Sequence, residues 1–268
     1  VGEPPNYRTI LAAQREDPPA GWQISWDGRR LGWAVSKTKS LPQEITEVRS
    51  LIHFDDLPLD RLVPDWLRVM APPIGRQRME VPVESRSTLV FDPLGRLSRF
   101  ESSVRLDAQE PFVKMRGSLD GSKMALWLRV GGLPPFETDV DVPRDAMLGE
   151  TLSPQSHLPG LHEGQSWTME SYSPLRPPSS PKEILHATVE ATTPLVWQGR
   201  TVDTRLVVYR SDPGDTVGHS GGPRGKLWVR PDGTVLKQEV TILRSTMTFL
   251  RMGPEEAAAL AAKASLDD

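Results

Sequence analysis

The chain has 268 residues, of which 37% are apolar and 25% are charged, and its formal net charge is −3. This composition is typical of a folded globular protein and excludes wholesale disorder. A slightly acidic chain matches phosphate backbones poorly, so we expect no nucleic-acid partner. There is no cysteine, which excludes disulfides, thiolate nucleophiles and cysteine-ligated metal sites.

Residues 1–20 are predicted to be an N-terminal tether, because prolines surround the one short stretch, Tyr7 to Arg15, that could form a helical turn or two. The chain begins with Val1 rather than Met, so we expect that a signal peptide or a membrane anchor preceded it. No run approaches about 18 apolar residues, and no transmembrane segment is predicted.

The first predicted β half, 21–142, opens on a hairpin. Apolar residues alternate with polar ones, which marks a half-buried strand; they are Trp22, Ile24 and Trp26. The dipeptide Asp27-Gly28 is a strong signal for a two-residue turn. The resulting register places Ile24 opposite Leu31 and Trp22 opposite Trp33, with both pairs on the core face.

Residues 55–76 are predicted to form a short helical insertion, because leucines recur there near helical spacing, interrupted by Pro58 and Pro64. The other strands of this half follow from apolar alternation and from turns such as Asp92–Gly95. They are predicted at 44–54, 79–91, 96–106, 111–119, 123–130 and 136–142.

Residues 143–163 contain three prolines and two glycines and are predicted to be a linker or a crossover. The second β half, 164–252, and the tail, 253–268, follow. The tail is predicted to form a short helix, because Pro254 and two glutamates precede an alanine-rich run. The strands of the second half are predicted at 164–173, 183–196, 201–210, 225–230, 234–243 and 245–252.

A turn motif recurs in the two halves: Trp26–Leu31 is echoed by Trp197–Val202. Either the chain is an internal duplication, with 55–80 inserted into the first half, or such turns recur by chance, as they do in β proteins. In both cases the fold class is all-β. We predict an antiparallel β-barrel or a strongly curved sheet of long hairpins, because closure or wrapping removes exposed strand edges.

The segment Gly218 to Gly222 matches G-x-S-x-G, the nucleophile elbow, with Ser220 as the serine and His219 beside it. That elbow works only where a strand turns sharply into a helix. Prolines on both sides of the segment argue against such a turn, so loop 211–225 is predicted to be a hairpin tip. A serine hydrolase that uses this loop is an alternative; we assign no catalytic residue.

Two sets of candidate metal ligands have simpler interpretations. Glu137, Asp139 and Asp141 share one strand face at intervals of about 6.5–7 Å, as on a solvated outer face. His157 and His162 flank a Pro-Gly turn at a spacing that fits no helix or zinc ribbon, and we expect both to be exposed. We predict no metal site and no cofactor.

The chain has eight tryptophans and only three tyrosines. Core and cross-strand packing is one interpretation of the tryptophans. An aromatic-lined cleft for an acyl chain or a glycan is the other. In the second case the ligand-binding residues are the strand tryptophans and two loop residues: Trp22, Trp33, Trp127, Trp167, Trp197, Trp228, His219 and Ser220.

The motif Trp22-x-Ile24-x-x-x-Gly28-x-x-Leu31-Gly32-Trp33 resembles one found in a family of uncharacterised exported bacterial β-barrel proteins. It is also similar to the β-rich domain N-terminal to envelope transglutaminase-like proteins. Further matches are Thr88–Asp92 with Gly95, Met115–Gly121 and Leu161–Trp167. The resemblance implies a β domain in the bacterial periplasm or cell envelope. It carries no catalytic residue across, because the Cys-His-Asp core of those enzymes has no counterpart in a chain without cysteine.

Together these features favour a non-catalytic cell-envelope β module that binds a hydrophobic, glycan or protein partner. The partner would be a lipid, a glycan or an envelope protein. One alternative is the serine hydrolase that uses loop 211–225. The other is a purely structural domain of a membrane-anchored assembly.

Overall fold

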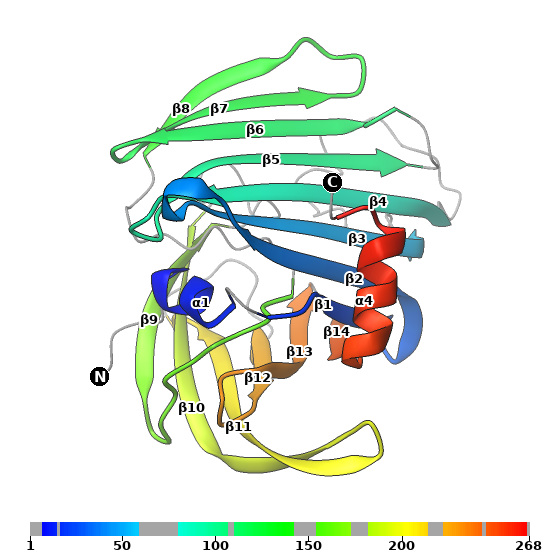
Figure 1. Cartoon of the computed structure of the whole chain (residues 1–268), viewed down its shortest axis with the longest axis vertical. Helices are drawn as coiled ribbons and strands as arrows, with labels where there is room; N and C mark the ends of the chain where they lie inside the picture. Colours follow the sequence, from blue (N-terminus) through cyan, green and yellow to red (C-terminus); the bar gives the residue numbers. More distant parts are fainter. Residues whose placement is uncertain are drawn as a thin grey trace.

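The structure is a computed structural model that describes residues 7–14, 17–58, 80–106, 110–141, 154–172, 182–213, 222–242 and 245–266. These residues form one antiparallel sheet of 14 strands (Figure 1). The strands are β1 (Ala20–Trp26), β2 (Arg29–Ser40), β3 (Thr46–Pro58), β4 (Glu80–Phe91), β5 (Leu97–Leu106), β6 (Val113–Asp120), β7 (Lys123–Val130), β8 (Phe136–Asp141), β9 (Ser166–Tyr172), β10 (Lys182–Trp197), β11 (Arg200–Ser211), β12 (Gly225–Val229), β13 (Val235–Ile242) and β14 (Ser245–Arg251). The helices are α1 (Tyr7–Gln14) and α4 (Pro254–Lys263), with a single 3₁₀ turn at Pro42–Glu44.

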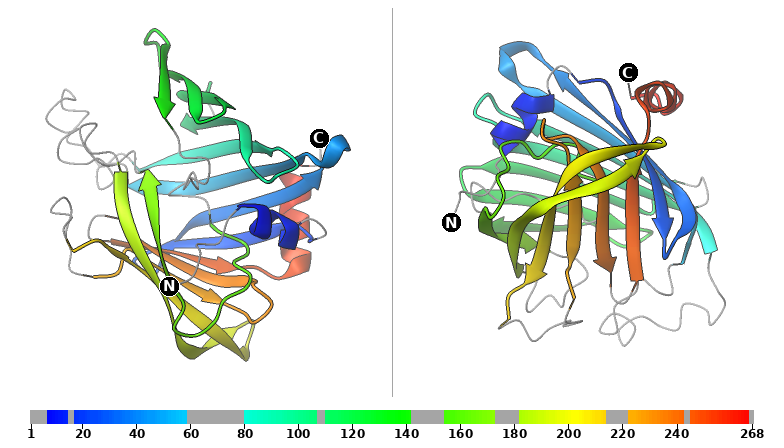
Figure 2. Two further views of the ribbon diagram at one scale, coloured as in Figure 1. Left: turned by 90° about the vertical axis from the view of Figure 1, so that its left-hand side faces the viewer. Right: turned by 90° about the horizontal axis from the view of Figure 1, so that it is seen from below.

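Two meanders leave the centre of the sheet in opposite directions. The strand order is β8-β7-β6-β5-β4-β3-β2-β1-β14-β13-β12-β11-β10-β9. We call β1–β8 the first arm and β9–β14 the second arm. The arms join where β1 pairs with β14, and the end strands β8 and β9 do not pair with each other. The sheet therefore curves strongly without closing (Figure 2), which confirms the predicted all-β sheet of long hairpins.

Both tryptophan-bracketed turns are two-residue hairpins. Asp27 and Gly28 have φ of 48° and 82°, and Gln198 and Gly199 have φ of 50° and 73°. Positive φ at both central residues is the signature of the type I′ turn, whose twist matches that of the strands. The first hairpin lies at the centre of the sheet and the second near its β9 end. The duplication itself stays a prediction.

The predicted register of the first hairpin is wrong by one residue. Trp22 pairs with Ala34, and Trp33 pairs with Gln23. The cause is a β-bulge: Ile24 pairs with Gly32 and Ser25 with Arg30, so Leu31 is an extra residue on β2. One extra residue turns the following side chains to the opposite face. Trp22 and Trp33 therefore lie on opposite faces of the sheet.

The main core lies on the face that we call the inner face. It includes Trp22 and Phe249 from the centre, Phe54 from the first arm, and Trp167 and Val207 from the second arm. Because one buried cluster joins residues of both arms, the sheet has to bend around it. This bending explains why the chain needs no second sheet to bury its apolar residues.

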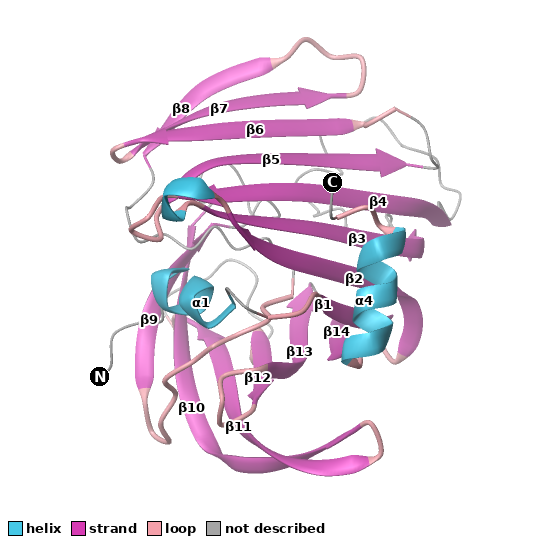
Figure 3. Cartoon of the chain, in the orientation of Figure 1, coloured by secondary structure: helices cyan, strands magenta, loops and turns pink. Residues whose placement is uncertain are grey.

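Figure 3 shows α1 and α4 lying against the sheet, and each is held there by a smaller apolar cluster. Leu11 of α1 packs against Phe91, Phe100 and their neighbours on the first arm. On the opposite, outer face, Ala261 of α4 packs over Val35 and Leu51. The predicted C-terminal helix is thus confirmed, and its apolar side covers the centre of the sheet. No helix in the described part of the chain is long and apolar enough to cross a membrane.

Three predicted segments differ from what is found. Helix α1, within the expected tether, packs on the sheet, where Gln14 is 8% exposed. The described part of the expected linker, 154–163, is also packed, and Leu158 is 1% exposed in the main core. Residues 55–58 are not helical, because β3 continues to Pro58; the rest of the predicted insertion, 59–76, lies outside the described residues. The predicted domain boundaries stay a prediction.

Candidate functional site

The strand tryptophans do not line one cleft. Trp22 and Trp167 are buried in the main core, where the edge of the Trp167 ring faces Tyr209. Trp33 lies on the outer face, stacked on His53 with 5.3 Å between ring centroids. Their roles in ligand binding stay predictions, as do those of His219 and Ser220, which lie outside the described residues.

The other three tryptophans predicted to bind a ligand are Trp127, Trp197 and Trp228, and all three are half-buried. The Trp197 indole nitrogen donates a 2.7 Å hydrogen bond to the carbonyl oxygen of Arg251, which fixes it structurally. The other two are each capped by a cation: the Lys237 ammonium lies 4.4 Å from the Trp228 ring centre, and the Arg116 guanidinium lies 4.2 Å from that of Trp127. Of these, Trp127 lines a hollow in the surface.

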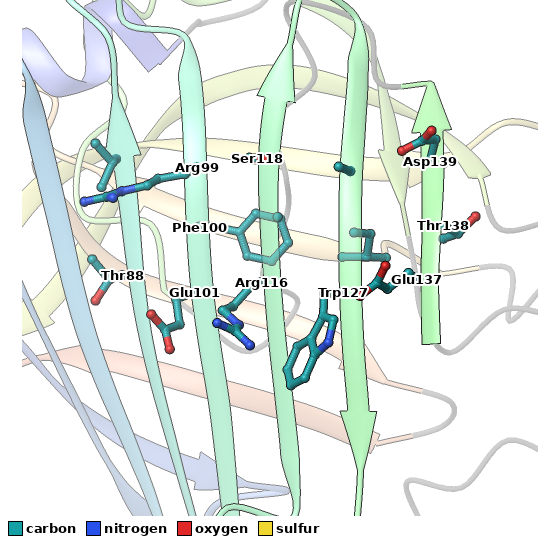
Figure 4. Close-up of a pocket in the computed structure, with 14 residues that line it drawn as sticks. Thr88, Arg99, Phe100, Glu101, Arg116, Ser118, Trp127, Glu137, Thr138 and Asp139 are labelled. Carbon is teal, nitrogen blue, oxygen red and sulfur yellow. The ribbon is translucent and has the colours of Figure 1, made fainter. Parts of the chain in front are cut away.

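That hollow lies over a row of side chains that crosses β4–β8 (Figure 4). Residues directly opposite one another on successive strands form the row: Thr88, Glu101, Arg116, Trp127 and Glu137. Residues that pair across strands share a face of the sheet. The row members are followed or preceded along their strands by residues of the inner-face cluster around Phe100, such as Leu89 and Leu126. Because neighbouring residues of a strand point to opposite faces, the row lies on the outer face. With strands about 4.8 Å apart, the row is about 19 Å long.

A second row runs beside the first, two residues away on each strand. Its members are Val90, Arg99, Ser118, Ala125 and Asp139. Ser118 and Ala125 are small and face each other at the middle, while longer side chains stand around them. A hollow of about 900 Å³ results. We call it the outer-face hollow.

Gly117 contributes to the floor of the hollow for a packing reason. It lies between Arg116 and Ser118, and its missing side chain would point to the inner face. A Cβ atom there would overlap the ring of Phe100, a buried member of the inner cluster. The same glycine thus lets a core aromatic ring approach the backbone directly beneath the hollow.

The electrostatics of the outer-face hollow are mixed. Arg99 and Arg116 supply guanidinium donors, and Glu101, Glu137 and Asp139 supply carboxylate acceptors. All five side chains are exposed. An exposed cation–π pair such as Arg116–Trp127 contributes about 0.5–1 kcal/mol, which restrains the indole. The arrangement combines fixed aromatic surface with hydrogen-bonding groups of both kinds, so it is suited to binding.

A second polar cluster lies on the other arm, at the base of loop 211–225. Asp212 Oδ2 is 2.8 Å from Nε2 of His186, and Thr168 Oγ1 is 3.2 Å from Nδ1 of the same ring. On the inner side, the buried Glu183 accepts hydrogen bonds from Ser211 and from Arg224. Neither the His186 cluster nor the Glu183 cluster shows in the sequence, because the members of each lie far apart along the chain.

The linker histidines differ from each other. His162 is exposed, as predicted, but the prediction for His157 is wrong, because this residue is only 6% exposed. Burial lowers the pKa of His157, although the carboxylate of Asp17 opposes that shift; Asp17 Oδ2 lies 2.8 Å from its Nε2. Among the described residues, no three His, Asp or Glu side chains come together as metal ligands.

Comparison with known proteins gives a likeness in fold alone. No protein-family model matches the sequence, and no curated protein matches it. A β-barrel-like protein of the domain of unknown function DUF1849 from Brucella abortus is similar, with a TM-score of 0.51 and 12% identity over 89% of this chain and 97% of that one. A DUF1089 family protein from Pseudomonas aeruginosa has a TM-score of 0.37 and 15% identity over 78% of this chain and 90% of that one.

The first likeness shows that the fold is β-barrel-like, as expected from the sequence. The second is too distant to carry an argument. Neither bears on the expected link to transglutaminase-associated domains, which stays a prediction.

Proposed function

We propose that this chain is a non-catalytic module of the bacterial cell envelope that binds a polar ligand, a glycan or a protein segment, in the outer-face hollow of β4–β8. The observation that carries the proposal is the position of Trp127 in a hollow of about 900 Å³ among charged side chains. The envelope location rests on the sequence resemblance described above. Fractionation of the native host with an antibody to this chain tests it.

The hollow favours a polar ligand over an acyl chain. Five exposed charged side chains surround its small-residue centre. An acyl chain laid there would strip water from these charges without replacing its hydrogen bonds, at a cost that apolar contact with one indole does not offset. A ligand with hydroxyl, amide or carbonyl groups replaces those hydrogen bonds.

Native mass spectrometry tests the binding function. The whole chain is incubated with a soluble extract of bacterial cell envelopes, and bound species are detected by mass. We expect a retained ligand that is lost in Ala125→Trp, because the larger side chain blocks the centre of the hollow. Ala191→Trp is the matched control, since Ala191 is an exposed alanine on β10, in the other arm. A ligand retained equally by both variants contradicts this site.

One observation favours the hydrolase alternative: His186 and Asp212 form a hydrogen-bonded pair at the base of the loop that contains Ser220. A hydroxyl nucleophile has to lie within about 2.6–3.2 Å of its base. We expect no stoichiometric labelling of Ser220 by a fluorophosphonate probe, because Pro213 and Pro223 on either side of its motif argue against the strand–turn–helix support of an elbow. Labelling that Ser220→Ala abolishes would establish an enzyme.

A further inference from the structure

We infer that the ligand of the outer-face hollow is an uncharged glycan chain that lies across the strands, with one sugar ring against Trp127. This inference rests on the proposed function, because it assigns a ligand class to the same site. Three features of the hollow lead to it: its balance of charge, its direction relative to the strands, and its place on a sheet face.

The first feature is the balance of charge. Arg99 and Arg116 stand in the same hollow as Glu101, Glu137 and Asp139. A ligand of uniform charge, such as an acidic polysaccharide or a polycation, meets like charges wherever it lies. Hydroxyl groups both donate and accept hydrogen bonds, whereas a carboxylate only accepts and a guanidinium only donates. A neutral polyhydroxyl chain therefore satisfies both sets of side chains.

The second feature is direction. The row from Thr88 to Glu137 crosses five strands and is about 19 Å long. In Figure 4 its labelled side chains lie side by side, with Arg99, Ser118 and Asp139 in a parallel line. A long ligand that follows this row contacts polar side chains on β4, β5, β6 and β8 and the indole ring on β7. The second line of side chains lies along one flank of it.

The third feature separates a glycan from a protein segment. An extended peptide gains most of its affinity by adding to a strand edge, where main-chain groups pair. The hollow is on a sheet face, and the backbone groups of β5, β6 and β7 are already paired within the sheet. A peptide there would leave its own amides without main-chain partners. A sugar ring brings hydroxyls at its rim and C–H groups on its faces.

Trp127 suits such a ring. Indoles present a large apolar surface with a polar edge, and the Trp127 ring is half-buried with a guanidinium 4.2 Å from its centre. This contact restrains the indole before the ligand arrives, which lowers the entropic cost of binding.

Calorimetric titration of the whole chain tests the inference with defined probes. The neutral probes are maltohexaose, cellohexaose and chitohexaose. The comparison probes are a hexagalacturonate, a polar decapeptide that carries both charge signs, and dodecanoate. We expect at least one neutral hexasaccharide to bind ten or more times more tightly than every comparison probe. Trp127→Ala should weaken that binding about tenfold or more, as loss of a central aromatic contact does.

Trp228→Ala is the matched control, because Trp228 is also half-buried beneath a cation but lies on β12. It should change the affinity by less than twofold. The inference is overturned, while the hollow stands as a binding site, if the peptide or dodecanoate binds better and Ala125→Trp abolishes that binding. Both proposals fall if Ala125→Trp affects no probe, or if no probe and no extract component binds.

Discussion

Trp22 is a residue on which the stability of the centre of the sheet depends. Its side chain is 0% exposed, within the cluster that joins the two arms. We predict that Trp22→Ala lowers the free energy of unfolding by about 3–5 kcal/mol, as for other buried tryptophans. Urea denaturation measures this. Trp33→Ala, on the outer face, should cost less than half as much, and equal losses would contradict the register described above.

His157 gives the protein an acid-sensitive position. Its Nδ1 atom is buried without a hydrogen-bond partner among the described residues. The pKa of His157 lies below its usual value of 6.5, and burial is the largest cause. The carboxylates of Asp17 and Asp232 oppose this shift, whereas the Arg251 guanidinium adds to it. The unfolded chain therefore binds this proton more tightly than the folded chain. The stability that neutral His157 contributes is complete above pH 6.5 and is lost as the pH falls below that value.

We predict that His157→Gln makes the free energy of unfolding less dependent on pH between 7.5 and 5.5. His162→Gln should leave the dependence unchanged, because His162 is exposed. Denaturation curves at several pH values check both variants. An unaltered slope in His157→Gln would show that other groups control the acid sensitivity.

At the scale of elements, the pairing of β2 with β3 depends on Gly32. A Cβ atom at this position would overlap the carbonyl oxygen of His53. We predict that Gly32→Ala destabilises the protein by about 1–3 kcal/mol, as overpacking does. Gly222→Ala is the control, because no described residue lies within 4 Å of a Cβ atom there. Thermal unfolding of the two variants compares them, and equal melting temperatures would refute the close approach.

An ion pair between Glu183 and Arg224 ties the start of β10 to the residue before β12. Glu183 is 5% exposed, and its Oε1 lies 2.9 Å from Nε of Arg224. We predict that Arg224→Leu costs about 3–5 kcal/mol, because it removes a cation that makes two hydrogen bonds to a buried carboxylate. The double variant Glu183→Leu with Arg224→Leu should recover much of that loss. A double variant no more stable than Arg224→Leu would show that the charge of the Glu183 carboxylate is not what destabilises the single variant.

The bounds of the strands and helices can be predicted well from the sequence, but the strand registers and the packing of the helices cannot. β6 was predicted at 111–119 and runs from Val113 to Asp120, and the C-terminal helix begins at Pro254 as expected. Periodicity and turn chemistry suffice for such bounds. The bulge at Leu31 was missed, because the extra residue is defined only by the partner strand. The packing of α1 was also missed. This helix has only eight residues, so the few apolar side chains that contact the sheet, such as Leu11, form no clear periodic pattern.

At the scale of the whole molecule, the sequence carries no local signal for the pairing of β1 with β14. The two strands are separated by nearly the whole chain, yet Ile24 pairs with Phe249. The candidate site was missed for the same reason. Trp127 was singled out, but Glu101 and Arg116 become its neighbours only through the registers of β5, β6 and β7. No local pattern in a single sequence fixes those registers.

The topology predicts an uneven distribution of stability along the sheet. The central strands β1 and β14 are paired on both edges and carry Trp22 and Phe249, both 0% exposed. At the end of the first arm, β8 pairs only with β7 among the described strands, and Phe136 is 59% exposed. Amide exchange reports local opening, which takes less free energy where fewer apolar groups are buried.

We therefore predict that, in native-state hydrogen–deuterium exchange, β1 and β14 exchange slowest and β8 exchanges at least about tenfold faster. Trp22→Ala should accelerate exchange in both arms, because its cluster includes Phe54 from one and Val207 from the other. Phe100→Ala should act mainly on the first arm, where its smaller cluster lies. If Trp22→Ala left the second arm unchanged, the two arms would be separate folding units, and the single bent sheet would not be the unit of cooperativity.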